Sequence, residues 1–115
     1  MTGGGRTPEE LETLLEDALL LHDAPAVAGL FEDGGMLVPG HGSPAMRGRE
    51  EILLVAPPWQ RQRGYVADPR RIYQARDVAL LIGDGVVNVA RRGQDGLWRY
   101  AISILDDQGA KACPS

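Results

Sequence analysis

A glycine-bounded turn near the end of the chain constrains its fold more than any other feature. Gly93-Gln94-Asp95-Gly96 separates two β-rich runs, residues 85–92 and residues 97–105. Glycine supplies the backbone angles that a tight return needs, so these runs are predicted to pair as an antiparallel hairpin. A chain of 115 residues is expected to form one domain, residues 1–115, in which this hairpin packs against the segments that precede it.

The register of this hairpin decides which side chains face the interior. With a four-residue loop over residues 93–96, Arg91 opposes Trp98, which predicts a cation–π contact at the rim of the sheet. A slip of one residue would exchange the two faces, because successive side chains of a strand alternate between them. The face expected to form the core or a pocket wall comprises Val87, Val89, Tyr100, Ile102 and Ile104. The face expected to point the other way comprises Asn88, Ala90, Arg92, Arg99, Ala101 and Ser103.

The start of the first helix is marked by capping residues. Thr7 suits the cap position, Pro8 suits the first helical position, and Glu10 completes a capping box. An apolar stripe follows at helical spacing, and the acidic side chains, Glu12 among them, are expected to lie largely outside it. This stripe comprises Leu11, Leu14, Leu15, Ala18 and His22.

The remaining segments predict two more helices and a sheet. Asp23-Ala24-Pro25 repeats the cap and proline for a short helix that ends near Phe31. A third helix is expected over residues 49–56, closed by the two prolines that follow it. Further strands are expected at residues 36–38, 45–47, 65–67, 71–75 and 78–82. Two helices, a hairpin, a helix and a β-meander predict an α+β domain.

Charge and cysteine content narrow the class of partner. The net charge of -4 argues against nucleic acid or an anionic membrane as the main partner. Cys113 is the single cysteine, and no apolar run is long enough to cross a membrane, so we expect a cytoplasmic protein. Residues 1–6 and 108–115 are expected to be flexible tails.

Two segments carry most of a family resemblance. They are Met46-Arg47-Gly48-Arg49-Glu50, which leads into the third helix, and Asp95-Gly96-Leu97-Trp98-Arg99-Tyr100 in the final hairpin. With residues 18–39 and 77–83 they follow the order seen in the nuclear transport factor 2-like superfamily. Over residues 8–106 the chain resembles the SnoaL-like, ketosteroid-isomerase-like bacterial branch of that superfamily.

The resemblance implies a cone-shaped fold. In such proteins a strongly curved, mostly antiparallel sheet wraps about three helices, leaves a cavity at its wide end, and often pairs two copies as a homodimer through the sheet. The link at residues 83–85 is shorter than is usual there, which implies a shallower cone. Members include isomerases, cyclases, epoxide hydrolases and proteins without a known reaction, so the fold alone does not settle the function.

The candidate site residues follow from the chemistry that such a cavity would need. Proton transfer requires a carboxylate or a histidine, and Asp33 and His41 are weak candidates for that catalytic role, since both also suit exposed positions. Two histidines and one cysteine do not form a metal-ligand cluster. The expected ligand-binding residues are Trp59, Tyr73, Val87, Val89, Tyr100 and Ile102, although the aromatic ones also suit a core.

Two functions therefore remain open. The first is a small-molecule-binding cone for an apolar organic ligand, which either only binds it or also isomerises or cyclises it by proton transfer without a cofactor. The second is a non-catalytic homodimeric interaction or scaffold module with a filled or shallow cavity. In that case the sheet face that contains Asn88 and Ser103 is the expected partner surface.

Overall fold

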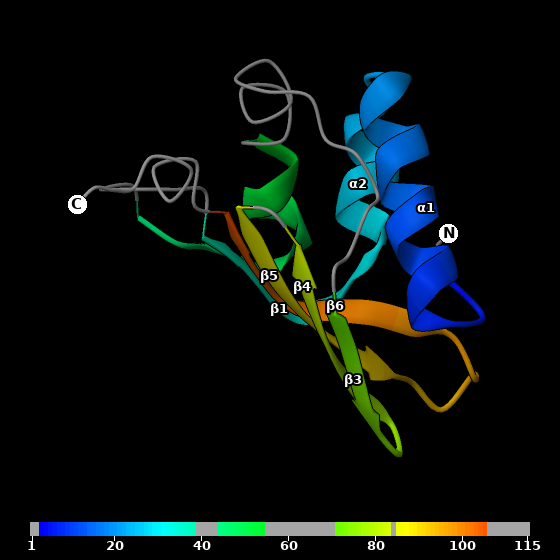
Figure 1. Ribbon diagram of the computed structural model, residues 1–115. Helices are drawn as coiled ribbons and strands as arrows, with labels where there is room; N and C mark the ends of the chain where they lie inside the picture. Colours follow the sequence, from blue (N-terminus) through cyan, green and yellow to red (C-terminus); the bar gives the residue numbers. More distant parts are fainter. Residues whose placement is uncertain (1–2, 39–43, 55–70, 84, 106–115) are drawn as a thin grey trace.

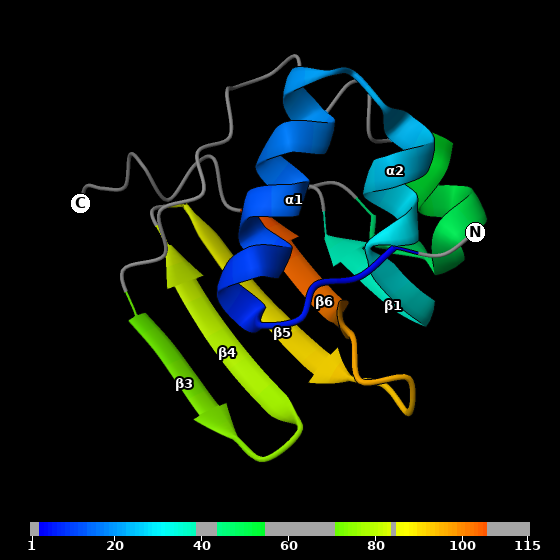
Figure 2. The same cartoon turned by 90° about the vertical axis from the view of Figure 1, so that its right-hand side faces the viewer.

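Three helices lie on one face of a six-stranded sheet. The computed structural model describes residues 3–38, 44–54, 71–83 and 85–105. In this part of the chain, the face of the sheet opposite the helices carries no helix (Figures 1 and 2). The predicted α+β architecture is therefore confirmed. The elements are α1 (Pro8–Leu20), α2 (Ala24–Gly29), a helix at residues 48–54, β1 (Phe31–Val38), β2 (Met46–Arg47), β3 (Arg71–Ala75), β4 (Val78–Gly83), β5 (Val86–Arg92) and β6 (Trp98–Leu105).

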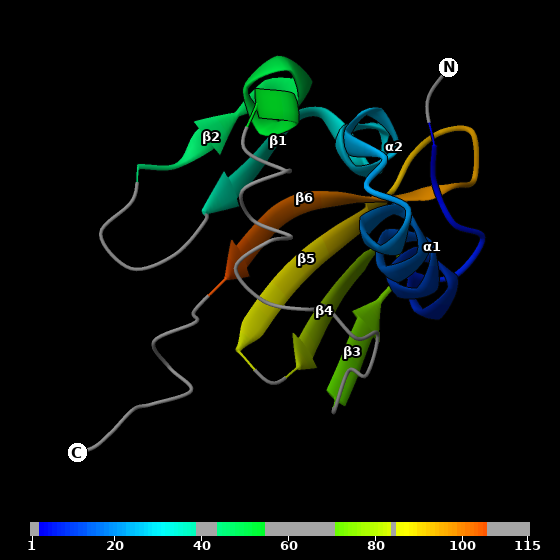
Figure 3. The same ribbon diagram turned by 90° about the horizontal axis from the view of Figure 1, so that it is seen from above.

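The sheet is mixed, open and curved. Its strand order is β2-β1-β6-β5-β4-β3, in which β1 runs parallel to β6 and every other neighbouring pair is antiparallel. Strands β5 and β6 bend along their length (Figure 3). A β-bulge lies at this bend, since Ala90 pairs with Tyr100 while Val89 pairs with Ile102, which leaves Ala101 as an extra residue. Bulges bend a strand and increase its twist, so this one contributes to the curvature.

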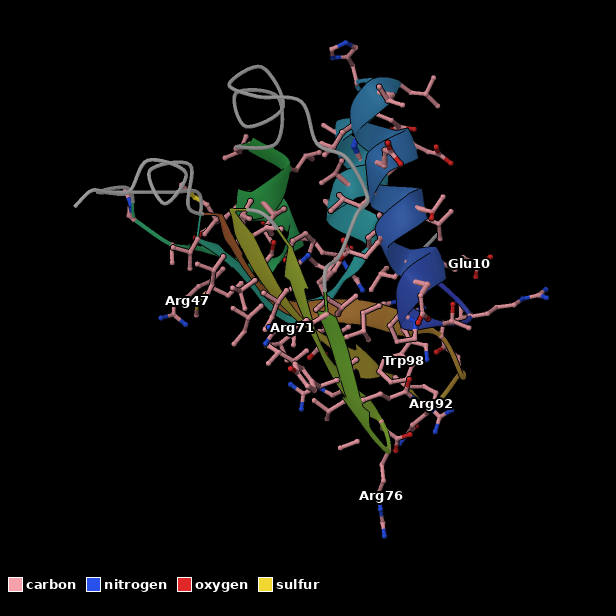
Figure 4. All side chains as sticks on the ribbon, in the orientation of Figure 1. Glu10, Arg47, Arg71, Arg76, Arg92 and Trp98 are labelled. Atoms are coloured by element: carbon pink, nitrogen blue, oxygen red, sulfur yellow. The ribbon has the colours of Figure 1, made fainter. Side chains whose placement is uncertain are left out.

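The final hairpin differs by one residue from the register that the sequence predicted. Its loop has five residues, because Gly93 N–H donates to the Leu97 carbonyl at 2.8 Å and Arg92, rather than Arg91, pairs with Trp98. Gly96, with φ of +83°, takes the left-handed conformation that closes the loop. The cation–π contact consequently joins Arg92 to Trp98, with the guanidinium carbon 5.7 Å from the ring centroid (Figure 4).

This shift exchanges the predicted faces of β5. Asn88 and Ala90 are fully buried on the side of the helices, whereas Val87 and Val89 lie on the opposite side and remain partly accessible. On β6 the bulge keeps Tyr100 on the helix side but turns Ile102 away from it. The prediction that Val87, Val89, Ile102 and Ile104 form the inner wall is therefore wrong.

The predicted caps of the first two helices are confirmed, whereas α2 ends earlier than predicted. The Thr7 hydroxyl accepts a hydrogen bond from Glu10 N–H at 3.0 Å, and Asp23 Oδ1 accepts one from Ala26 N–H at 3.2 Å. Phe31 belongs to β1 rather than to a helix, and its ring lies 5.4 Å from that of Tyr100. Pairing with β6 thus starts the strand at Phe31 and carries it through Gly34 and Gly35.

The N-terminal segment is anchored from residue 3 onward. Gly5 exchanges two backbone hydrogen bonds with Trp98, at 3.0 and 2.7 Å, and Gly3 N–H donates to the Gly29 carbonyl at 3.1 Å. Arg99 Nε donates to the Gly3 carbonyl at 2.7 Å. These contacts join residues 3–5 to α2 and β6, within the segment for which the sequence predicted a flexible tail.

The core lies between the helices and the sheet. Its fully buried side chains come from α1, α2, the helix at residues 48–54 and the four strands β1, β4, β5 and β6, and the largest are Trp98, Tyr100 and Phe31. In the part of the chain that the structure describes, no helix is long and apolar enough to cross a membrane.

Candidate functional site

Four polar side chains meet inside this otherwise apolar core. Glu12 projects from α1, while Asn88, Tyr100 and Ser103 project from β5 and β6 on the side of the helices. Asn88 Nδ2 and the Tyr100 hydroxyl each donate a hydrogen bond to Glu12 Oε2, both at 2.8 Å. The Ser103 hydroxyl donates to Asn88 Oδ1 at 2.6 Å. We call these four residues the Glu12 cluster.

The bulge in β6 makes this convergence possible. Tyr100 and Ser103 are three residues apart, and in a regular strand such a pair points to opposite faces. Because Ala101 is inserted opposite the Val89–Ala90 step, both side chains face the helices. Asn88 on β5 lies directly opposite Ser103 on β6, so these two polar side chains are neighbours. Tyr100 lies opposite Ala90, at the next inward-facing pair of the same two strands.

Burial makes the hydrogen bonds of this cluster energetically important. The exposed fraction of each of the four residues is between 0% and 2%. Moving a carboxylate out of water is costly unless hydrogen bonds replace its hydration, and bonds to an ionised acceptor are stronger than neutral ones. The two donors from the sheet therefore help to hold the Glu12 carboxylate in the interior.

Several ion pairs lie nearer the surface, outside the Glu12 cluster. Arg91 Nε bonds Glu32 Oε2 at 3.0 Å, and Arg92 Nε bonds Asp77 Oδ1 at 2.8 Å. The Arg99 guanidinium bonds both carboxylate oxygens of Asp95, at 2.7 and 3.2 Å. The Arg99 side chain, followed by the Leu97 N–H, lowers the pKa of Asp95 to about 2. These pairs tie strands and loops together and lie outside the Glu12 cluster.

The predicted catalytic candidates are not part of this cluster. Asp33 is exposed on β1, with its carboxylate 3.8 Å from the guanidinium of Arg49. His41 lies outside the described residues, as does the predicted ligand-binding Trp59.

The predicted ligand-binding residues separate into two groups. Tyr100 belongs to the Glu12 cluster. Tyr73 is exposed on β3 and shares the outer face of the sheet with Val87, Val89 and Ile102. Ligand binding by these four residues remains a prediction, and any ligand there would lie on the side of the sheet away from the helices.

Sequence reasoning missed Glu12, and helical spacing could have found it. On the surface of α1, Glu12 lies between Leu11 and Leu15 and on nearly the same side of the helix as Leu19. It is therefore in the middle of the buried stripe. A lone carboxylate inside such a stripe indicates a buried polar contact. Asn88 and Ser103 were placed on the face that was expected to point away from the core and to form a partner surface, because the register was displaced by one residue.

Solved structures share the architecture that holds this cluster. A ketosteroid isomerase-like protein from Erwinia carotovora atroseptica superposes with a TM-score of 0.68 at 19% identity, over 85% of this chain and 91% of its own. An NTF2-like protein with a cystatin-like fold from Novosphingobium aromaticivorans superposes with a TM-score of 0.67 at 16% identity, over 90% and 81%. This chain has the nuclear transport factor 2-like fold. The resemblance to that superfamily is thus confirmed at the level of the fold.

A third solved structure is a complex with S-DNPA. This protein from Catenulispora acidiphila, in complex with S-DNPA, superposes with a TM-score of 0.63 at 18% identity, over 85% of this chain and 88% of its own. No protein-family model and no curated protein matches the sequence.

Proposed function

We propose that this protein is a small-molecule-binding domain whose polar centre is the Glu12 cluster. Binding sites for organic ligands are mostly apolar and contain a few convergent polar groups that fix the orientation of the ligand. The convergence of Asn88 and Tyr100 on one oxygen of a buried carboxylate is the observation that carries this proposal. The complex of the Catenulispora acidiphila protein with S-DNPA supports a ligand role for the shared fold.

If the domain is an enzyme, Glu12 is the residue that we expect to accept a proton. Among the described residues, Glu12 is the one ionisable acid that is buried. A buried carboxylate beside a bound carbon acid is suited to act as a general base, because bulk water does not compete with the ligand for its oxygens. Isomerisations and cyclisations that pass through a carbanion begin with such a step, so they are the reactions that we propose for an apolar organic ligand.

Ligand binding is tested by a thermal-shift screen of the purified protein with steroid-like, terpenoid and polyketide-like molecules. A molecule present at about 100 times its Kd stabilises the folded state by about 2.7 kcal/mol. Absence of stabilisation across all three classes would contradict the binding proposal. The same screen on Glu12→Gln identifies those molecules whose binding depends on the carboxylate.

Proton abstraction is tested with 5-nitrobenzisoxazole as a probe. A base that removes the proton on C3 of this molecule breaks its N–O bond, and a nitrile and a coloured phenolate form without any further reactant. We expect saturable turnover by the wild-type protein and a loss of about a hundredfold or more in Glu12→Gln. Glu9→Gln is the matched control, because Glu9 is exposed in the first turn of the same helix. Equal rates for the two variants would remove Glu12 from the proposed reaction.

A non-catalytic homodimeric module is the second candidate, and the outer face of the sheet favours it. One row of paired positions crosses this face from Tyr73 through Leu80, Val89 and Ile102 to Met36. Tyr73, Val78 and Ile104 on this face are 39% to 54% exposed. The face that the sequence suggested for a partner, with Asn88 and Ser103, is buried under the helices, so that suggestion is wrong.

The distribution of charge suggests that a second copy of this chain covers the outer face. Its centre is apolar, while Arg71 and Arg47 lie on the two edge strands and point away from the helices (Figure 4). An apolar centre with a charged rim is typical of protein interfaces, and one such face is sufficient for a two-fold dimer.

A further inference from the structure

We propose that Ser103 is a positioning residue for Glu12, acting through the side-chain amide of Asn88. This inference rests on the proposed role of Glu12 as a proton acceptor. The Ser103 hydroxyl donates to Asn88 Oδ1, and the other end of that amide donates to Glu12 Oε2. The three side chains thus form a chain of hydrogen bonds that ends on the carboxylate.

The chemistry of the amide explains why Ser103 matters. An asparagine side chain has one end that accepts hydrogen bonds and one that donates them, and the two ends have nearly the same shape. Only the NH2 end is compatible with a carboxylate oxygen at 2.8 Å, because the carbonyl end would repel it. The Ser103 hydroxyl donates to Oδ1 at 2.6 Å and thereby stabilises the amide in the orientation that Glu12 needs.

The backbone holds Ser103 in a well-defined place. Ser103 pairs with Asn88 on β5 and with Leu37 on β1, so it lies in the interior of the sheet with a neighbouring strand on each side. Side chains on such elements are placed more precisely than those on loops. The hydroxyl is therefore a fixed reference for the amide, whereas Glu12 lies on a helix that packs across the sheet.

The orientation of the amide is tested first in the ligand-free protein by NMR. The Asn88 side-chain amide protons are assigned through their nuclear Overhauser contacts with the Tyr100 ring and compared among the wild-type protein, Ser103→Ala, Ser103→Thr and Glu12→Gln. We expect Ser103→Ala to move these resonances most of the way to their positions in Glu12→Gln. Ser103→Thr, which keeps the hydroxyl, is expected to leave them near the wild-type positions. Wild-type amide resonances in a folded Ser103→Ala protein would overturn the proposal.

The consequence for proton transfer is tested with 5-nitrobenzisoxazole. We expect Ser103→Ala to lower kcat by about tenfold with little change in KM, because the base is misplaced while the apolar binding region is kept. Ser103→Thr is expected to recover most of the rate, and a purely structural role would give no such recovery at equal thermal stability. If the wild-type protein does not turn over the probe, the proposed proton-accepting role of Glu12 fails, while the NMR comparison still supports or overturns the positioning role. Equal kcat in folded Ser103→Ala and in the wild-type protein would also overturn it.

Discussion

The hydroxyl of Tyr100 donates a hydrogen bond to the carboxylate of Glu12 across 88 positions of sequence, at a distance of 2.8 Å. It joins the last strand of the sheet to the first helix. Because both side chains are buried, neither group can exchange this bond for one to bulk water without opening the core. The bond therefore contributes to the docking of α1 on the sheet as well as to the geometry of the Glu12 cluster.

The first prediction concerns this hydroxyl. Tyr100→Phe removes one donor from a buried carboxylate, so we expect the free energy of unfolding to fall by about 1–3 kcal/mol. Urea denaturation monitored by circular dichroism measures this change. Tyr73→Phe is the matched control, because its hydroxyl is exposed on β3, and we expect a change within about 0.5 kcal/mol. Similar losses in both variants would show that the Glu12 contact does not stabilise the fold.

The local signals in the sequence predicted most of the elements of this fold. Thr7 and Asp23 cap helices as expected, and residues 71–75 and 78–82 form strands β3 and β4 as expected. These signals depend on neighbouring residues, so tertiary contacts change them little. The start of β1 at Phe31 was missed, because it depends on pairing with β6 rather than on its own glycine-rich sequence.

The candidate site was harder to predict, because it depends on two details of the final hairpin: the length of its loop and the bulge in β6. Each of them displaces the strand pairing by a single residue. A loop of five rather than four residues exchanges the faces of β5, and the extra Ala101 in β6 then brings Tyr100 and Ser103 to the same side. Glycine spacing limits the length of such a loop without fixing it. A bulge has no comparable mark in this sequence, so the contact of Asn88 with Glu12 emerges only from the folded chain.

The second prediction concerns the close approach of the N-terminal segment to α1. A Cβ atom at Gly5 would lie 2.7 Å from the backbone nitrogen of Leu11, and backbone atoms cannot move aside cheaply. We expect Gly5→Ala to lower the free energy of unfolding by about 1–3 kcal/mol. Gly34→Ala is the matched control, since a Cβ there meets nothing within 4 Å, and its unfolding midpoint should stay close to that of the wild-type protein. A stable Gly5→Ala protein would mean that the segment does not pack as described.

The third prediction concerns pH and the pair of Asp95 and Arg99. The pKa of Asp95 falls from 3.8 to about 2 in the folded protein, first because Arg99 donates to its carboxylate and then because the Leu97 N–H does. Because the pKa of Asp95 is lower in the folded than in the unfolded protein, its ionised carboxylate stabilises the folded state above about pH 4, where the unfolded chain is also ionised. This contribution is lost as the pH falls towards 2.

Thermal unfolding of the wild-type protein and of Asp95→Asn, compared from about pH 5 to about pH 2, measures this pH dependence. We expect the wild-type protein to have the higher midpoint at the upper end of this range and the difference to vanish at the lower end. A carbon-detected NMR titration should place the Asp95 midpoint at about pH 2. An Asp95 midpoint near 3.8 would show that Arg99 does not hold the carboxylate in solution.

The fourth prediction concerns the outer face of the sheet. Val89 lies on β5, at the middle of the row that joins Tyr73 to Met36, and its side chain points away from the helices. If two copies pair through this face, Val89→Lys places an unpaired ammonium group in the centre of a desolvated interface. Burial of such a charge costs several kcal/mol, and each 1.4 kcal/mol weakens the dimer about tenfold.

Gel filtration with light scattering at high micromolar concentration measures the effect. We expect the wild-type protein to elute as a dimer and Val89→Lys to elute as a monomer with an unchanged far-ultraviolet circular dichroism spectrum. Gln74→Lys is the matched control, because it adds the same charge to the edge strand β3 on the side that faces the helices, where its partner is the buried Ala79. A folded Gln74→Lys protein should remain dimeric. Elution of the wild-type protein as a monomer would leave the apolar outer face without a second copy to cover it, and the dimeric module would then be excluded.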